Sequence, residues 1–415
     1  MNKPTLFGYG LTTKSIANKL GGGCLFFDDK TEEPYTDEEG NQILPSSMFD
    51  PEKSSIEVTT PSLKPNNPLI KKAKNLLSEY DYFLGRVLSL DNTKNTPKKP
   101  FTIWISGTNG KTTTTQMLTR ILEKRGALSG GNIGTPLAKL DENAPIWVLE
   151  SSSYTLHHTN QAVADIYLLL PITPDHLDWH GTAEQYEADK LKPLLNMREG
   201  ALALVPKGLN LPSTNAWVVE YDSNEFLEEF FNLDASKLRY KAAFLQDALL
   251  SLAVTRVLFQ EADYELLNSF TLDHHRQEES IDYKDRLWVN DSKATNVDAT
   301  IQAINTYKDR KIHLIIGGDD KGVDLVPLMD MISSHDITIY TVGSNNDKLT
   351  EMAQSRGIPA HSCDLVDIAI KEIDKNLTQN EVALLSPAAS SLDQFTSYTK
   401  RGELFLGMVR DLSDA

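Results

Sequence analysis

The sequence predicts an α/β protein of three domains, each built on a mostly parallel sheet that is covered by helices. Three observations support this prediction. Short β-branched apolar runs alternate with segments of helical periodicity along most of the chain. The 415 residues are too many for one ordinary hydrophobic core. Several apolar runs also lead directly into glycine-containing turns, which is typical of strand–turn–helix units.

Composition suggests where the domains begin and end. We expect a Rossmann-like domain over residues 1–90, a P-loop ATPase-like domain over 91–272 and a second Rossmann-like domain over 273–415. Asp91–Pro100 is rich in lysine, asparagine and proline, as linkers are. Residues 31–50 are acidic and polar, which predicts a loop with little regular structure.

The individual elements follow from apolar runs bounded by turn residues. In the first domain we expect a strand that enters a glycine turn over Thr5–Gly10, a second strand over Cys24–Asp29 and a third over Ser55–Thr60. The central domain should contain strands at Phe101–Ser106, Ile146–Glu150, Ile166–Leu170 and Ala201–Val205, followed by a long helix at Lys241–Phe259. The third domain should contain strands at Leu287–Asn290, Ile312–Ile316, Ile337–Val342 and Val382–Leu385.

Charge and cysteine content restrict the possible partners and compartment. The formal charge of −17 argues against non-specific nucleic-acid binding, so anionic ligands would need locally concentrated basic residues. Only Cys24 and Cys363 occur, which indicates a reducing cytoplasm rather than a disulfide framework. No apolar run approaches membrane-spanning length and the polar start is not a signal peptide, so we expect a cytoplasmic protein without membrane insertion. We also expect a monomer.

The strongest motif is a phosphate-binding loop in the central domain. The expected strand Phe101–Ser106 runs into Gly107-Thr-Asn-Gly-Lys-Thr112, and a helical apolar spacing follows. Backbone N–H groups and the helix N-terminus would hold phosphates, Lys111 would reach the terminal phosphates, and Thr112 could bind magnesium. The usual first glycine is absent, because Ile105 stands six residues before the lysine. The alternative is an ordinary strand-to-helix turn.

A second glycine turn lies near the N-terminus. Gly8 and Gly10 follow a strand, and the acids Asp28 and Asp29 end the next strand, which suggests a nucleotide site of the Rossmann type. The third glycine of the dinucleotide fingerprint is replaced by Thr13. A simple strand-to-helix turn explains these residues equally well.

Two further strand ends in the central domain carry polar residues. Glu150 ends an apolar strand, where a carboxylate is well placed to bind magnesium, although the serines after it could equally cap a helix. His176 lies between Asp175 and Asp178, and could be a metal ligand or a turn histidine held by its neighbours. Lys190 falls on an expected helix, where a lysine is usually solvated.

Three polar loops follow strands of the third domain. They are Asn290–Asn296, Gly317–Gly322 and Ser386–Phe395. The first two have the geometry of an anion site, but each could be a plain connection. A scaffold of three α/β modules would leave these polar clusters without a role.

Taken together, these motifs resemble the Mur ligase family, the ATP-dependent amide-forming ligases of bacterial peptidoglycan synthesis. The resemblance covers nearly the whole chain and includes Gly107–Thr112, the Glu150 strand end, Asp175–Asp178, Tyr186-x-Ala-x-Lys190 and His275-Arg276. Within the family, Asn290–Asn296 looks like the loop of the D-glutamate-adding enzymes. The Asp-Asn-Pro-Arg signature of the diaminopimelate-adding enzymes is absent.

The resemblance implies a function in cell wall biogenesis, and so in cell shape, cell division and the cell cycle. The substrates would be ATP, UDP-N-acetylmuramoyl-L-alanine and D-glutamate, which react through an acyl phosphate. A different amino acid, or a P-loop NTPase activity, is the alternative. A nicotinamide oxidoreductase would need the missing third glycine. ATP on the central domain and glutamate on the third would require the C-terminal domain to close.

The resemblance also assigns site residues. The catalytic residues would be Lys111, His176 and Lys190. ATP would be bound by Gly107, Thr108, Asn109, Gly110, Lys111, Thr112, Thr113, Arg276 and Asp291. Two magnesium ions would be held by Thr112, Glu150, His176 and Lys190, the lysine being a carbamate formed with carbon dioxide.

The remaining assignments concern the other two substrates. The UDP-linked substrate would contact Leu11, Thr12, Asp28, Asp29 and Asn132. D-Glutamate would contact Lys293, Thr295, Lys321, Ser391 and Tyr398, the last being phenylalanine in many relatives. The His-Asn-x-x-Asn motif of the helix that closes the ATP site is replaced by Ala243-Phe-Leu-Gln-Asp247, so the sequence leaves adenine recognition open.

Overall fold

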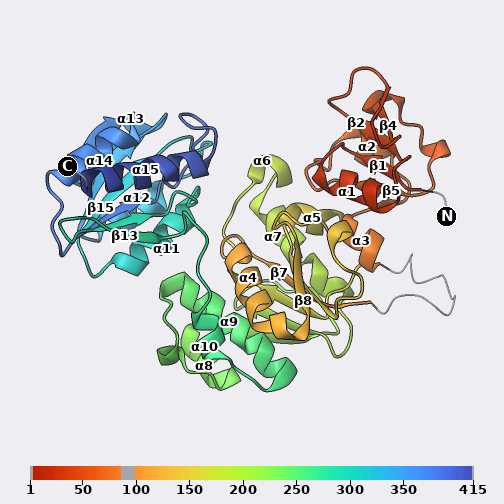
Figure 1. Ribbon diagram of the computed structural model, residues 1–415, viewed down its shortest axis with the longest axis horizontal. Coiled ribbons are helices and arrows are strands. Elements are labelled where there is room, and N and C mark those ends of the chain that lie inside the picture. Colours follow the sequence, from red (N-terminus) through yellow and green to blue (C-terminus); the bar gives the residue numbers. More distant parts are fainter. Residues whose placement is uncertain (1–2, 86–98, 414–415) are drawn as a thin grey trace. The chain divides into compact units, whose positions relative to one another are not determined.

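The computed structural model describes residues 3–85 and 99–413 and contains three six-stranded sheets with helices (Figure 1). This confirms the predicted α/β class. The chain divides into two compact units, Met1–Arg239 with Phe244–Phe270 and Tyr240–Ala243 with Thr271–Ala415. The first unit contains two of the sheets and the second unit contains the third. The predicted boundary at residue 90 and most of the predicted linker lie outside the described residues.

The first sheet has the strand order β3-β4-β2-β1-β5-β6. Its strands are β1 (Thr5–Phe7), β2 (Leu25–Asp28), β3 (Tyr35–Thr36), β4 (Gln42–Pro45), β5 (Glu57–Thr59) and β6 (Leu76–Leu77), and its helices are α1 (Leu11–Lys19) and α2 (Pro68–Lys72). All pairings except β3–β4 are parallel. The expectation of little structure over 31–50 is wrong, because Ile43 is buried opposite Phe26 and makes β4 part of the sheet.

Thr13 stabilises the first glycine turn in place of the missing third glycine. Its hydroxyl donates to the carbonyl of Gly8 (2.5 Å) and accepts from the N–H of Gly10 (3.2 Å). The side chain is fully buried at the start of α1. The turn is therefore held by a side-chain hydroxyl.

The second sheet has the order β12-β11-β10-β7-β9-β8, and its pairings are parallel. Its strands are β7 (Phe101–Ser106), β8 (Ala127–Gly131), β9 (Ile146–Glu150), β10 (Ile166–Leu169), β11 (Leu202–Pro206) and β12 (Trp217–Tyr221). The helices of this region are α4 (Lys111–Leu122), α5 (Ser153–His158), α6 (Leu177–His180), α7 (Ala183–Leu191), α8 (Asn224–Phe231), α9 (Ala242–Phe259) and α10 (Tyr264–Asn268).

Helix α3 (Glu79–Leu84) joins the first sheet to the second within one compact unit. Tyr80 and Leu84 belong to the hydrophobic core of the second sheet. The buried carboxylate of Asp81 accepts hydrogen bonds from the N–H groups of Asn160, Gln161 and Ala162, at 2.7–3.1 Å. Because three backbone donors satisfy one buried carboxylate, this contact fixes the loop after α5.

The third sheet has the order β13-β14-β18-β15-β16-β17, and only β13–β14 is antiparallel. Its strands are β13 (Glu278–Ile281), β14 (Leu287–Asn290), β15 (Ile312–Gly317), β16 (Ile337–Val342), β17 (Ala360–Asp364) and β18 (Val382–Leu385). Helices α11 (Val297–Tyr307), α12 (Val326–Ser333), α13 (Asn346–Arg356), α14 (Val366–Asp374) and α15 (Tyr398–Ser413) accompany it. Alternate strand residues enter two separate core clusters, one on each face of the sheet.

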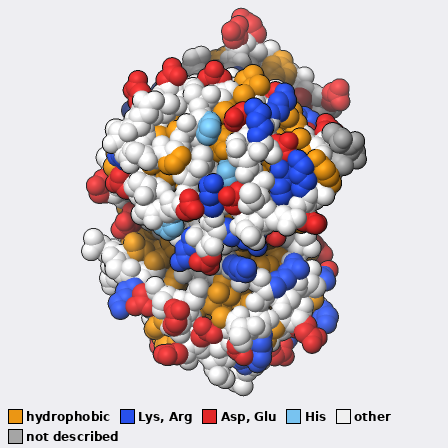
Figure 2. Space-filling model, turned by 90° about the vertical axis from the view of Figure 1, so that its left-hand side faces the viewer, with side chains coloured by type: hydrophobic (Ala, Val, Ile, Leu, Met, Phe, Trp, Pro, Cys, Tyr) orange, Lys and Arg blue, Asp and Glu red, His pale blue; other side chains and the backbone are white. Residues whose placement is uncertain are grey.

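Helix α9 is long and apolar enough to cross a membrane by length and composition, so the expectation that no apolar run approaches that length is wrong. Half of this stretch is buried inside the protein. On the face shown in Figure 2, basic side chains are interspersed with acidic ones, so the net charge of −17 does not make that face uniformly acidic.

Candidate active site

The second sheet brings three predicted loops to one edge. Strands β9, β7 and β10 are neighbours and run in parallel, so their carboxyl ends meet at the same edge. The phosphate loop follows β7, Glu150 ends β9, and Thr173–Asp178 follows β10. The carboxyl edge of a parallel sheet is where such proteins bind ligands.

The phosphate loop is compact because two glycines adopt left-handed conformations. Gly107 has φ of 140° and lies so close to Leu170 that a Cβ would be 2.5 Å from that residue's Cβ. Gly110 has φ of 82° and caps α4. Ile105, which occupies the position of the usual first glycine, is buried inside β7 and lies opposite Glu150. The loop therefore begins later than in the usual motif.

Two side chains of the loop make specific contacts. Lys111 donates to the carbonyl oxygens of Gly107 (3.0 Å) and Thr108 (2.7 Å). The hydroxyl of Thr108 donates to the carbonyl of Thr173 (2.9 Å) and lies 3.0 Å from the hydroxyl of Tyr186. Thr108 thus ties the phosphate loop to the segment that carries His176. Asn109 and Thr112 are partly buried, and Thr113 is buried.

Glu150 and Asn132 lie together. The side chain of Asn132 donates to Oε1 of Glu150 (2.7 Å), and its backbone N–H donates to the Glu150 carbonyl (2.8 Å). Oε2 of Glu150 is buried and has no hydrogen-bond partner among the described residues. A buried carboxylate oxygen of this kind fits a magnesium ion, which prefers oxygen ligands.

Lys190 is buried, although a lysine on a helix is usually solvated. It is 1% exposed, because this residue of α7 lies against β7 and β10: its Nζ is 3.5 Å from the Ser106 hydroxyl, and its carbonyl accepts from the Tyr167 hydroxyl. Its Nζ donates to the carbonyl of Gly107 (2.6 Å) and lies 4.7 Å from the centre of the Tyr186 ring. Burial and the nearby Lys111 hold its pKa well below the usual value. The amine therefore lies against the phosphate loop, in surroundings that favour its neutral form more than water does.

His176 lies at the N-cap of α6 with φ of 54°, and its side chain is 47% exposed. Its ring packs 5.1 Å from Tyr154 and 6.4 Å from Tyr186. Burial lowers its pKa although Asp175 opposes this effect, so the imidazole favours the neutral form that binds metals. Tyr186 thus contacts Thr108, Lys190 and His176, a central position that its place in the motif did not reveal.

A hydrogen-bond network that the sequence did not reveal lies beside Lys190. The carboxylate of Asp189 accepts from Nδ1 of His157 (2.9 Å) and Nδ1 of His180 (2.8 Å), which hold its pKa down at about 2. Nε2 of His180 pairs with the hydroxyl of Ser153 (2.9 Å). In the sequence this network appears only as His180 and Asp189, nine positions apart. Such histidine–acid pairs are too common to indicate a site. The network joins α5, α6 and α7.

No three His, Cys, Asp or Glu side chains converge as a metal site within residues 3–85 and 99–413. The predicted magnesium ligands contain only two such side chains, Glu150 and His176. The remaining ligands would be the hydroxyl of Thr112, a modified Lys190 and phosphate oxygens. This composition matches ions that bind together with a nucleotide.

In the second compact unit, the two predicted ATP residues lie close to each other. Asp291 is buried and accepts from the Ser386 hydroxyl (2.9 Å) and the Gln277 N–H (3.2 Å). Burial raises its pKa to about 7, and the positive charge of Arg276 opposes that shift. Nε of Arg276 is buried without a hydrogen-bond partner in the described part of the chain.

Four of the predicted D-glutamate residues come from three loops that are hydrogen-bonded together, and the fifth, Tyr398, begins α15. The N–H of Ala388 donates to the carbonyl of Ala294 (3.0 Å), and Asp319 and Ser390 form an antiparallel bridge. Nζ of Lys293 lies 5.4 Å from the centre of the Tyr398 ring. Ser391 is buried and Thr295 and Lys321 are exposed, Lys321 with φ of 52°.

The predicted UDP residues lie at the carboxyl edge of the first sheet. Leu11 is 56% exposed at the start of α1, beside the half-buried Thr12. Asp28 ends β2, and the next residue, Asp29, accepts from the side-chain amide of Asn67 (2.6 Å). Asn132 lies instead beside Glu150 in the second sheet, in the same compact unit.

The segment that replaces the adenine motif places one acid beside the phosphate loop. Asp247 is buried on α9, and a Cβ added at Gly110 would lie 2.7 Å from its Oδ1. Asp247 therefore places a carboxylate beside the phosphate loop. The His-Asn-x-x-Asn motif would place the amide of its last asparagine at this position of α9. The Asp247 carboxylate also explains why residue 110 must be glycine.

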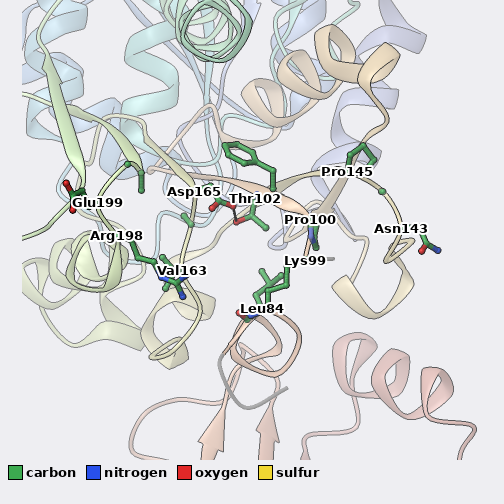
Figure 3. Close-up of a pocket in the computed structure, with 15 residues that line it drawn as sticks. Leu84, Lys99, Pro100, Thr102, Asn143, Pro145, Val163, Asp165, Arg198 and Glu199 are labelled. Atoms are coloured by element: carbon green, nitrogen blue, oxygen red, sulfur yellow. Dashed lines mark hydrogen bonds between the residues drawn. The ribbon is translucent and has the colours of Figure 1, made fainter. Parts of the chain in front are cut away.

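A cavity of about 700 Å³ lies at the opposite, amino end of the central strands (Figure 3). Its lining includes Phe101, Pro145, Asp165 and Ala201, which lie at or next to the starts of β7, β9, β10 and β11. The side chain of Lys99 donates to the carbonyl of Leu84 (2.6 Å). None of the predicted site residues lines this cavity.

Comparisons with known proteins give a family match in the central region and relatives that cover nearly all of the chain. The family model described as the Mur ligase middle domain matches residues 105–243. A Campylobacter jejuni protein named UDP-N-acetylmuramoylalanine–D-glutamate ligase is 47% identical over 99% of this chain and 100% of its own length. A Helicobacter pylori protein of the same name is 42% identical over 98% and 99%.

Solved structures show the same fold at low identity. MurF ligase from Thermotoga maritima in complex with ADP has a TM-score of 0.58 at 15% identity, covering 94% of this chain and 95% of that one. UDP-N-acetylmuramate–alanine ligase MurC from the same organism has a TM-score of 0.55 at 16% identity, covering 99% of both chains.

Proposed function

The chain belongs to the Mur ligase family, and from this premise we propose that it joins D-glutamate to UDP-N-acetylmuramoyl-L-alanine with the use of ATP. The observation that carries the proposal is the 47% identity to a ligase of that name over 99% of this chain and all of the relative. Such a reaction is a step of peptidoglycan precursor synthesis. Its nucleotide substrates indicate a cytoplasmic enzyme.

The first chemical step transfers the γ-phosphoryl group of ATP to the alanine carboxylate and releases ADP. The N–H groups of the loop Gly107–Gly110, the N-terminus of α4 and the Lys111 ammonium would bind the phosphates. Thr112, Glu150, His176 and a carbamate on Lys190 would hold magnesium, which neutralises phosphate charge when bound. Arg276 and Asp291 would bind the ribose and phosphate region of ATP.

The second step is attack of the D-glutamate amine on the carbonyl carbon of the acyl phosphate. The tetrahedral intermediate then expels inorganic phosphate and leaves an amide bond. Lys293, Thr295, Lys321, Ser391 and Tyr398 would orient the amino acid, which needs partners for two carboxylates. Leu11, Thr12, Asp28, Asp29 and Asn132 would hold the UDP-linked substrate.

A coupled assay of ADP release tests this proposal. Purified protein is supplied with ATP, magnesium and UDP-N-acetylmuramoyl-L-alanine, and each amino acid is added in turn. We expect rapid ADP release with D-glutamate only, and negligible release when either substrate is left out. Release with a different amino acid would indicate another Mur-type ligase, and release without any amino acid would indicate a P-loop NTPase.

Amino-acid selectivity gives a second prediction, in which Lys321→Ala and Ser391→Ala each raise the KM for D-glutamate. Loss of one hydrogen bond to a carboxylate should cost about 1.5–3 kcal/mol, roughly a 10- to 100-fold rise. The KM for ATP should change by less than about twofold, since neither residue belongs to the set proposed to bind ATP.

Lys375→Ala is the matched control, because Lys375 is an exposed lysine of the same unit that pairs with Glu372. It should leave all three KM values unchanged. If Lys321→Ala and Ser391→Ala raised the KM values for ATP and D-glutamate equally, the assignment of these residues to the D-glutamate site would be wrong.

A further inference from the structure

Arg401 is a buried arginine in the first turn of α15. It is 2% exposed and is one of the largest fully buried side chains in the described structure. Its Nε donates to the hydroxyl of Ser292 (3.0 Å), and its Nη2 donates to the carbonyls of Ser292 (2.9 Å) and Ala389 (3.2 Å). All three acceptors are neutral oxygens on two different loops.

Those two loops carry most of the residues proposed to bind the amino acid. Ser292 immediately precedes Lys293, and Ala389 lies two positions before Ser391. The Ser292 hydroxyl also donates to the carbonyl of Tyr398 (2.8 Å). The guanidinium therefore connects the loop after β14, the loop after β18 and the start of α15. Its rigid, planar set of donors suits such a connection.

The charge of Arg401 is not balanced by a close carboxylate. No Asp or Glu oxygen of the described residues lies within ion-pair distance of it, and the acid that acts on it electrostatically is Asp393, whose carboxylate accepts from the N–H of Ser344 (2.8 Å). Burial lowers the pKa of Arg401 to about 10, so the side chain stays charged at neutral pH. A buried charge without a counter-ion is unfavourable, and a nearby anion would offset that cost.

We propose that Arg401 is a positioning residue that prepares the amino-acid site for a dicarboxylate. Its hydrogen bonds hold the Lys293 and Ser391 loops in one arrangement, and its charge attracts an anionic substrate that it does not touch. This inference rests on the proposed function for the location of the amino-acid site. It adds a residue that no motif assigned.

A purely structural role is the competing explanation, and the chain offers a control for it. Phe405 lies one turn further along α15, is fully buried and packs 6.0 Å from Trp288. Phe405→Leu should lower the melting temperature without disturbing the two loops that Arg401 connects. Arg410→Met removes an exposed arginine from the same helix and controls for loss of charge.

The test compares Arg401→Met, Arg401→Lys, Phe405→Leu and Arg410→Met in the full chain. For each variant, melting temperature and the KM values for ATP, the UDP-linked substrate and the amino acid are measured. We expect Arg401→Met to raise the amino-acid KM at least about tenfold, as for a lost charged hydrogen-bond partner, with the ATP KM within about twofold. Arg401→Lys, which keeps the charge, should recover part of the loss. The two control variants should leave the amino-acid KM unchanged.

An amino-acid KM within twofold of the wild type in folded Arg401→Met would overturn the proposal, as would an equal rise in Phe405→Leu at equal loss of stability. If Arg401→Met does not fold, Ser292→Ala removes one acceptor and should raise the amino-acid KM severalfold. No change in that variant counts against the proposal. A wild type that uses another dicarboxylic amino acid refutes the proposed function alone, since the Arg401 variants are then measured with that amino acid. A wild type that uses only amino acids with a single carboxylate overturns both.

Discussion

Lys111→Ala is expected to reduce kcat/KM by at least about 10³-fold, the scale on which one cation stabilises a transferring phosphoryl group. The Lys111 ammonium is the positive side chain of the phosphate loop, and its contacts are with loop carbonyls rather than with a core. The fold should survive, because α4 is held by the buried Met117, Leu118, Ile121 and Leu122. The melting temperature and circular dichroism spectrum should therefore remain close to those of the wild type.

Lys124→Ala is the matched control for that experiment. Lys124 is an exposed lysine just beyond the other end of the same helix. Its loss removes the same charge without approaching the loop, and activity should be unchanged. Near-normal turnover in a folded Lys111→Ala variant would show that Gly107–Thr112 is not the ATP site.

Lys190→Ala is expected to lose most activity, at least about 10²-fold, as for loss of one preorganised charged group at a reaction centre. The buried amine lies on the carbonyl of Gly107, and burial together with Lys111 favours its neutral form. A neutral amine adds to the carbon of carbon dioxide and releases a proton, which leaves an anionic carbamate. The ordinary lysine pKa of about 10.4 would instead keep the group cationic and repel magnesium.

Chemical rescue and isotope labelling make the carbamate testable. A small carboxylate such as acetate should partly restore Lys190→Ala, because it supplies oxygen ligands at the vacated position. The wild type equilibrated with ¹³C-bicarbonate should show a carbamate carbon signal that is absent from the variant. An unmodified lysine in fully active enzyme, insensitive to removal of bicarbonate, would contradict the proposal.

Lys192→Ala is the control for Lys190, because Lys192 is the next lysine along the chain, at the C-cap of α7. Lys192 is partly buried and donates to the carbonyl of His157, so it is not a free surface lysine. Its loss should cost about 1 kcal/mol of stability, as for one hydrogen bond, while activity is kept. Activity lost in both lysine variants would implicate the packing of α7 rather than a group at position 190.

The sequence by itself determined the features that depend on local chemistry. The phosphate loop, the strands β7, β9 and β14, and the loop Asn290–Asn296 were predicted because turn residues and apolar alternation act over a few positions. The placement of these loops at strand ends also followed, since parallel strands expose their carboxyl ends together. The sequence shows that Ile105 replaces the usual first glycine of the loop. It does not show that Ile105 is part of β7 and that the loop begins later.

Only the tertiary structure decided which polar side chains are buried and what they touch. The letters around Lys190 are those of a solvated helix, yet α7 packs this face against the central sheet and places the amine on Gly107. Asp189 and Arg401 likewise gain their roles from partners far away in the sequence. Burial depends on long-range packing, which one helix's periodicity does not specify, and burial sets the cost of a charge and hence its chemistry.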